Sequence, residues 1–183
     1  RIIKLMEKKH MKKISVIVPM YYEEKVVNEC YKRLTSILQK LINYDYEIIF
    51  IDDGSKDKTL SLLEKIAIVD HKVKVISFTR NFGHQCAVTA GLKHVSGDAV
   101  VIIDADLQDP PELIPDMILL WEEGNKIVYG KRKKRKGESA FKVVTAKMFY
   151  KALNALSDIE IPKDTGDLRL VDKEVVDVIN KLP

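Results

Sequence analysis

The chain has 183 residues, 46% of them hydrophobic and 32% charged, which suits one well-buried domain and does not favour two. No apolar run approaches the roughly 20 residues that span a bilayer, so the sequence as given contains no predicted transmembrane helix. Its net charge of +4 is smaller than the charge of the single basic run Lys131–Lys136, so an anionic partner would be met locally.

Strand-like and helix-like segments alternate along most of the chain. A β-rich run, Ile14–Pro19, precedes Glu24–Asn43, where apolar residues recur every three or four positions as in an amphipathic helix. The alternation continues with predicted strands at about 46–52, 73–79, 99–104 and 126–130, and with helices at about 58–67, 84–94 and 111–123. This pattern predicts an α/β domain of right-handed βαβ units with a mostly parallel sheet flanked by helices.

The two ends of the chain depart from this alternation. Residues 1–11 are predicted to be a leader or remnant ahead of one domain over 12–183. Near the other end we expect a long helix over Ala140–Leu156, a loop, a short strand at 168–171 and a closing helix that ends at Leu182.

The two cysteines carry no sign of a metal site, because Cys30 and Cys86 lack the spacing of metal ligands. Each lies in a stretch that is predicted to be helical. We therefore expect reduced and packed thiols.

Polar sequences follow four of the predicted strands, at Pro19–Glu24, Asp52–Ser55, Thr79–Gly83 and Asp104–Asp109. Functional groups of a parallel sheet cluster at the carboxyl ends of its strands, so we expect these loops to surround one crevice. The chain has no GxGxxG after the first strand and no GxxxxGK[ST] anywhere, which excludes a glycine-rich phosphate loop. Phosphates would instead be met by a metal and by basic side chains.

The sequence VVIIDADLQDPPE at 100–112 runs from a buried strand directly into acidic residues. Asp104 and Asp106 are two positions apart, so both carboxylates can reach one divalent ion, with Gln108 as a neutral oxygen ligand. Such hard ligands suit Mg²⁺ or Mn²⁺. Asp109 stands before two prolines, which favours a helix N-cap for it rather than a metal ligand.

The loops after the second and third strands admit structural and functional interpretations. In IDDGSKDKT a carboxylate could accept hydrogen bonds from a base or a ribose, or the loop could be a turn capped by Ser55 or Asp57. In TRNFGH, Asn81 and Gly83 indicate turn and cap chemistry. A lone histidine at a helix start, His84, is more often structural or solvent-facing than catalytic.

The basic run and the DTGDLRL sequence are also open to two interpretations. The run is typical of a solvated loop or a nucleic-acid tail, yet it follows a strand on the crevice side, so Arg132 and Arg135 are candidate phosphate ligands. DTGDLRL suits a loop that leads into a strand, and the alternative to a functional role is a turn with a surface ion pair.

Taken together, VPMYYEE, IDDGSKD, RNFGH, DADLQDPPE and DTGDLRLVD resemble, in this order, the motifs of the family 2 inverting glycosyltransferases. Within that family the chain is most similar to the polyprenyl-phosphate group, which contains bactoprenol glucosyltransferases and dolichol-phosphate mannose synthases. The resemblance implies the GT-A fold, a Rossmann-like sandwich. One position departs from the family pattern, because Tyr22 stands where the family usually has asparagine.

The resemblance also implies roles for individual residues. The nucleotide pocket would be lined by Pro19, Tyr21, Glu23, Asp53 and Asp104; Mg²⁺ or Mn²⁺ would be held by Asp104, Asp106 and Gln108; phosphates would face Arg132 and Arg135. Asp167 would lie beside the reacting groups, as a base or as a positioning group.

The implied activity is transfer of a hexose, with inversion, from a nucleotide-diphosphate sugar to polyprenyl phosphate, with a UDP-sugar favoured as donor. The reaction would take place at the cytoplasmic face of a membrane. The full-length protein would reach this membrane through regions absent from this chain. It could also form a homo-oligomer. The helix over 141–156 would lie near the bilayer or pack on the sheet. The alternatives are a saccharide acceptor and, in another class, nucleic-acid binding through residues 131–136, which leaves the acidic residues unused.

Overall fold

The computed structural model describes residues 11–131 and 165–182. The expectations for the leader, the basic run after Lys131 and the helix over 140–156 therefore concern residues outside the described ranges. Among the residues that are described, no helix is long and apolar enough to cross a membrane.

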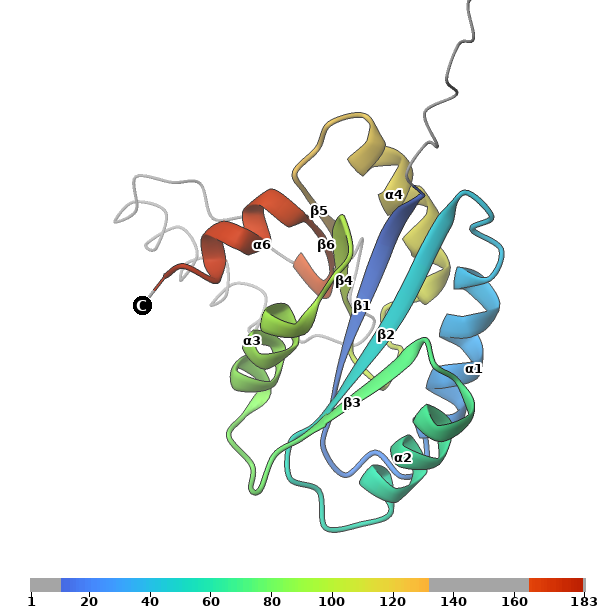
Figure 1. The fold of residues 1–183 in the computed structure, drawn as a ribbon, viewed down its shortest axis with the longest axis vertical. Coiled ribbons are helices and arrows are strands. Elements are labelled where there is room, and N and C mark those ends of the chain that lie inside the picture. Colours follow the sequence, from blue (N-terminus) through green and yellow to red (C-terminus); the bar gives the residue numbers. More distant parts are fainter. Residues whose placement is uncertain (1–10, 132–164, 183) are drawn as a thin grey trace, which may run out of the picture.

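Six strands form one sheet, in the spatial order β3-β2-β1-β4-β6-β5 (Figure 1). The strands are β1 (Lys12–Met20), β2 (Tyr44–Asp52), β3 (Val73–Ser77), β4 (Ala99–Ile102), β5 (Ile127–Lys131) and β6 (Thr165–Asp172). The helices are α1 (Val27–Leu38), α2 (Thr59–Val69), α3 (His84–His94), α4 (Ile114–Glu122) and α6 (Lys173–Ile179), and a 3₁₀ turn, η1 (Pro111–Leu113), precedes α4. Each of these elements lies within or close to a segment that the sequence predicts.

The sheet is parallel across β3, β2, β1 and β4 and changes direction at β6. Strand β6 inserts between β4 and β5 and is antiparallel to both. Strands β4 and β5 consequently run in the same direction, as a βαβ unit requires, but they do not pair with each other. The predicted α/β fold with a mostly parallel sheet is confirmed, and β6 adds one antiparallel strand to that sheet.

Helices cover both faces of the sheet (Figure 1). Successive side chains of a strand point to opposite faces, so the strands supply a core on each face. On one face Val16 and Phe50 pack with residues of α1, α2 and α4; on the other, Ile17 and Ile49 pack with residues of α3 and α6. The cysteines divide between core and surface. Cys30 in α1 is buried, as predicted, whereas Cys86 in α3 is exposed, because it lies on the outer side of the first turn of that helix.

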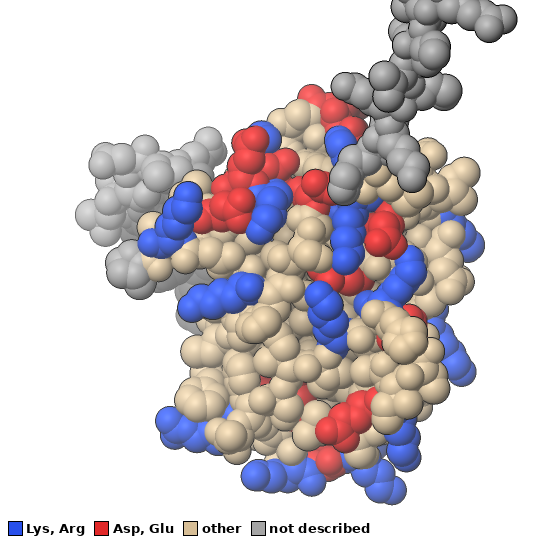
Figure 2. Space-filling model, in the orientation of Figure 1, with Lys and Arg blue, Asp and Glu red and all other residues tan. Residues whose placement is uncertain are grey.

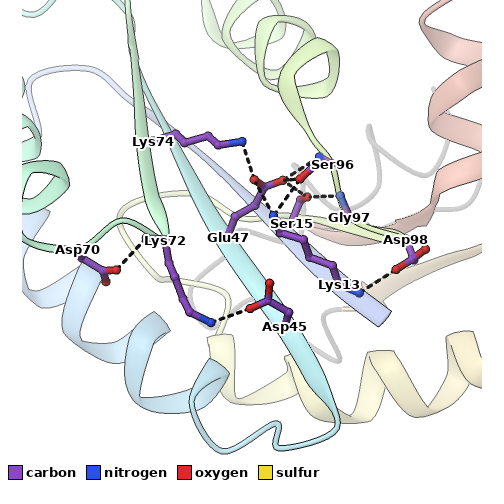
Figure 3. A network of polar contacts seen from close by, with 10 residues as sticks. All are labelled: Lys13, Ser15, Asp45, Glu47, Asp70, Lys72, Lys74, Ser96, Gly97 and Asp98. Carbon is purple, nitrogen blue, oxygen red and sulfur yellow. Dashed lines mark hydrogen bonds and ion pairs between the residues drawn. The ribbon is translucent and has the colours of Figure 1, made fainter. Parts of the chain in front are cut away.

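A buried carboxylate holds the loop before β4 against the sheet (Figure 3). Glu47 in β2 is only 2% exposed and accepts hydrogen bonds from Ser15, from the N–H and hydroxyl of Ser96, and from Lys13 and Lys74. Burial by itself raises the pKa of Glu47, but the bonds from Lys74, Ser15 and Ser96 outweigh it and lower the pKa from 4.5 to about 2.

Charged side chains are mixed over the surface. Figure 2 shows lysine and arginine side chains interspersed with acidic ones over one face, without a single broad basic patch in that view. The face shown therefore offers no extended positive field, and recognition of an anion there would depend on local groups.

Candidate active site

One cavity of about 260 Å³ lies at the carboxyl ends of β1, β2, β3 and β4. Its size is close to the lower end of the range for small-molecule sites, roughly 300–1,000 Å³. All four polar loops singled out in the sequence contribute to its walls, which consist of Pro19, Met20, Tyr21, Glu23, Asp53, Asn81, Gly83, His84, Ala87, Asp104, Ala105 and Asp106. The expected convergence of the strand ends is therefore present.

The loop after β1 carries two exposed tyrosine rings, and the ring of Tyr21 lines the cavity. Tyr21 and Tyr22 are 45% and 49% exposed, and their rings meet edge to face with centroids 4.6 Å apart. Tyr22 has φ 57°, the left-handed conformation that a bulky residue rarely adopts. Its backbone N–H donates to Ser55 Oγ at 3.0 Å, which ties this loop to the loop after β2.

Asp53 binds the neighbouring turn as well as lining the cavity. It is 3% exposed, and its two carboxylate oxygens accept the backbone N–H groups of Phe82 at 2.7 Å and Gly83 at 2.9 Å. Gly54 has φ 74°, and a Cβ built there would lie 2.4 Å from the backbone of Arg80. Only glycine allows the two loops to approach so closely. The capped-turn interpretation thus describes the observed bonds, and a nucleotide role for Asp53 stays a prediction.

The start of α2 is held by a reciprocal pair of acids. Lys58, rather than Ser55 or Asp57, occupies the cap position and makes no side-chain cap bond. The Asp57 carboxylate nevertheless accepts the N–H groups of Thr59 at 3.0 Å and Glu24 at 3.3 Å, and Glu24 in turn accepts the N–H of Lys58 at 3.0 Å. Asp57 therefore satisfies a helix-start donor from the position before the cap, and not as the predicted cap residue.

The acidic residues after β4 face the first turn of α3. His84 Nε2 lies 3.0 Å from Asp104 Oδ1, and Asp106 Oδ1 accepts the N–H of Gln108 at 3.0 Å. His84 is exposed, as the solvent-facing interpretation expects, but it also lines the cavity and contacts Asp104, a predicted metal ligand. Sequence alone provided no signal for this pair, since 20 residues separate its members.

The electrostatics of the cavity favour a cation. Burial raises the pKa of Glu23, and the negative charges of Asp106, Asp57 and Asp104 raise it further. No lysine or arginine is found among the described side chains that line the cavity. A positive ligand would therefore relieve the repulsion among these carboxylates.

The donor set fits a metal that is shared with a substrate. Within residues 11–131 and 165–182 there is no cluster of three or more His, Cys, Asp or Glu side chains arranged to hold a metal. Asp104 and Asp106 supply two carboxylates with hard oxygens to the cavity. That matches the way Mg²⁺ is usually bound, through one or two carboxylates with water and substrate phosphates completing the shell.

Asp109 does not cap the following helix as predicted. The cap position of η1 is Pro110, which makes no side-chain cap bond. Asp109 Oδ2 instead accepts the backbone N–H groups of Asp167 at 3.1 Å and Leu168 at 3.3 Å, at the start of β6. Leu107, two residues before Asp109, has φ 52°, in the left-handed region.

The remaining predicted site residues are less closely associated with the cavity. Gln108 and Asp167 are exposed and are not among its walls. Arg169 Nη2 lies 4.0 Å from Asp167 Oδ1, so the ion pair of the alternative interpretation exists there. Arg132 and Arg135 lie outside the described residues.

Comparison with known proteins agrees with this geometry. The family model described as glycosyl transferase family 2 matches residues 15–179. An uncharacterized glycosyltransferase, YkcC of Bacillus subtilis, is 51% identical over 92% of this chain and 52% of its own length. A bactoprenol glucosyl transferase of Shigella phage SfV is 46% identical over 93% of this chain and 55% of its own length. The chain thus spans about half the length of these relatives.

Two solved structures share the fold. The mannosyltransferase PcManGT of Pyrobaculum calidifontis, in complex with GDP-Man and Mn²⁺, superposes with a TM-score of 0.65 at 21% identity over 96% of this chain and 48% of its own. Glucosyl-3-phosphoglycerate synthase of Mycobacterium tuberculosis, with Mn²⁺, UDP-glucose and phosphoglyceric acid, has a TM-score of 0.59 at 25% identity over 90% and 57%. With its sheet, its strand-end cavity and its motifs in family order, the chain belongs to glycosyl transferase family 2.

Proposed function

We propose that the full-length protein transfers a hexose from a UDP-sugar to polyprenyl phosphate, with inversion at the anomeric carbon. One observation carries this proposal: the acidic residues after β4 lie in the same cavity as the loops after β1, β2 and β3, within a family 2 chain. The similarity to the bactoprenol glucosyl transferase of Shigella phage SfV supports bactoprenol phosphate as acceptor. The UDP-glucose complex of the mycobacterial enzyme supports the donor class.

Different residues of the cavity would bind different parts of the donor. Tyr21 would form an aromatic wall for the base at the rim, and Asp53 would hold the wall opposite through its bonds to Phe82 and Gly83. Asp104 and Asp106, with Gln108 beside them, would hold Mg²⁺ or Mn²⁺. When bound, this metal would neutralise the negative charge that develops on the departing diphosphate.

The acceptor phosphate does not need a base to remove a proton before it reacts. A lipid phosphate has a second pKa of about 6, so at pH 7 it is mostly a dianion and can attack C1 directly, from the face opposite the diphosphate. Asp167 would then orient the acceptor or a sugar hydroxyl rather than remove a proton. Arg132 and Arg135 remain predicted phosphate ligands, and the cytoplasmic membrane face remains the proposed place of reaction.

The test uses the full-length protein with labelled nucleotide sugars, Mg²⁺ or Mn²⁺, and undecaprenyl phosphate. We expect a lipid-linked sugar with a UDP-hexose, and a loss of turnover of at least about 100-fold in Asp106→Ala. Asp116→Ala is the matched control, because it removes an exposed carboxylate from α4, away from the cavity. Absence of lipid-linked product with UDP-, GDP-, CDP- and dTDP-sugars alike would refute the proposal.

The same assay separates the alternatives. Turnover with a saccharide acceptor and without lipid phosphate, together with a steep loss in Asp167→Asn, would favour the saccharide reaction, because a sugar hydroxyl needs a base. The nucleic-acid alternative has no support from the family or from the relatives.

A further inference from the structure

A single carboxylate joins the two sequence motifs that are most specific to this family. Asp109 belongs to the loop that carries Asp104 and Asp106, and its Oδ2 accepts the N–H groups of Asp167 and Leu168, 58 and 59 residues further along the chain. Asp109 is half-buried, and Leu168 is 1% exposed. The bond from Leu168 is therefore partly buried and the bond from Asp167 is exposed, and both are charge-assisted because their acceptor is a carboxylate.

The loop has a conformation that aims Asp109 at β6. Leu107 adopts φ 52° while its side chain packs against the core, and its N–H approaches the carbonyl of Asp104 at 3.3 Å. The bond from the N–H of Gln108 to Asp106 Oδ1 closes the same turn. A bulky residue in the left-handed region persists only where its surroundings hold it, and such residues concentrate at functional sites.

The start of β6 needs this support because its sheet partners are incomplete. Pairing of β4 with β6 runs from Ala99 and Asp172 to Ile102 and Arg169 and stops there. On the other side, the register between β5 and β6 shifts between Tyr129 and Lys131. Asp167 and Leu168 thus lie beyond the β4 ladder and beside an irregularity of the β5 ladder. At this point the carboxylate of Asp109, rather than a neighbouring strand, accepts the backbone N–H groups of β6.

We propose that Asp109 is a positioning residue that fixes Asp167 relative to Asp104 and Asp106. Asp104, Asp106 and Asp167 then belong to one rigid unit. When a bound donor orders the loop that carries Asp104 and Asp106, the start of β6 becomes more ordered as well. This inference rests on the proposed function only for the role of Asp167 in turnover. The mechanical link itself is independent of the reaction.

Amide hydrogen exchange of the full-length protein tests the link directly, because exchange reports local opening of a hydrogen bond. We expect Asp109→Ala to accelerate exchange at residues 165–169 by about tenfold or more. Asp109→Asn keeps an acceptor oxygen in the same place and should restore most of the protection. In the wild type, addition of Mn²⁺ and UDP should slow exchange at 165–169, and this slowing should vanish in Asp109→Ala.

Binding and turnover test the positioning role. Asp109→Ala should bind Mn²⁺ and UDP within about threefold of the wild type by calorimetry, while kcat falls about 10- to 100-fold, as is usual when a supporting hydrogen-bond partner is removed. Asp109→Asn should recover most of kcat. Asp116→Ala serves again as the control and should alter neither exchange at 165–169 nor kcat.

Failure of this inference can be told apart from failure of the proposed function. Absence of lipid-linked product in the wild type would sink the proposed function and leave the exchange measurements intact. Unchanged exchange at 165–169 in Asp109→Ala would overturn the link, whatever the activity. Should Asp109→Ala not fold, the wild type with and without Mn²⁺ and UDP decides, because an unaltered exchange rate at 165–169 overturns the coupling.

Discussion

At the scale of single residues, Tyr22 shows a conflict between conformation and side chain. Its φ of 57° lies in a region that suits asparagine far better than tyrosine, and the family usually has asparagine at this position. The residue is retained in that conformation by the bond from its N–H to Ser55 Oγ, while its ring contacts Tyr21 at the rim of the cavity. The departure from the family pattern therefore places a bulky residue in a conformation that such residues rarely adopt.

We predict that Tyr22→Asn raises the free energy of unfolding by about 0.5–1 kcal/mol, because relief of left-handed strain exceeds the loss of one exposed ring contact. Urea denaturation measures this change in the free energy of unfolding. Tyr22→Phe is the control, since it keeps both ring and strain and should change the stability by less than about 0.5 kcal/mol. A less stable Tyr22→Asn would mean that the contact with Tyr21 outweighs the strain.

At the scale of elements, Asp172 joins three parts of the chain at the junction of β6 and α6. Its carboxylate accepts Trp121 Nε1 of α4 at 2.7 Å, the N–H of Glu174 in α6 at 2.9 Å and Lys126 Nζ at 3.2 Å. Burial raises the pKa of Asp172, but the bonds from Trp121, Glu174 and Lys126 outweigh it and lower the pKa. The side chain is therefore an anionic helix cap shared with a buried indole.

Removal of this carboxylate should destabilise the fold substantially. Asp172→Ala leaves the indole N–H of Trp121 without its acceptor and α6 without its cap, so we expect a loss of about 2–4 kcal/mol in the free energy of unfolding. Trp121 is the single tryptophan of the chain, and its fluorescence follows the transition. The control Asp177→Ala removes an exposed partner of Lys173 and should cost less than about 0.5 kcal/mol. Similar losses in the two variants would contradict the shared role of Asp172.

At the scale of the whole molecule, the network around Glu47 connects β1, β2, β3 and the loop before β4 (Figure 3). It also involves Gly97, whose N–H donates to Ser15 Oγ at 2.9 Å. Glu47 lies five positions before Asp52, the last residue of β2, and the next residue, Asp53, lines the cavity. The network therefore stabilises the scaffold on which the strand-end loops are arranged.

This network predicts a dependence of stability on pH. The pKa of Glu47 is about 2 in the folded protein against an ordinary value of 4.5, so its stabilising contribution is fully present above pH 4.5 and is lost as the pH falls towards 2. The shift corresponds to roughly 3 kcal/mol. We expect the difference in unfolding free energy between the wild type and Glu47→Gln to be largest above pH 4.5 and to shrink towards pH 2. A difference that does not change with pH over this interval would contradict the predicted role of the Glu47 carboxylate.

Much of the architecture is local in origin and was predictable for that reason. The periodicity of apolar residues depends on near neighbours, so it located β1 and α3 and the other described elements closely. The gathering of polar loops at one edge follows from the parallel direction of successive strands. Pro19, Tyr21, Glu23, Asp53, Asp104 and Asp106 accordingly all line the cavity.

The partners of those residues could not be predicted in the same way. The sequence identifies Asp109 as an acid before two prolines, which favours a helix cap. Only the insertion of β6 between β4 and β5 brings Asp167 and Leu168 to it. The contact of His84 with Asp104 likewise depends on the packing of α3 against the sheet. By itself the sequence determined the elements, their order and the chemistry available at the strand ends, because these depend on short-range patterns. The tertiary structure decided which groups meet, because a hydrogen bond between residues 20 or 58 positions apart is set by how the strands pair and the helices pack.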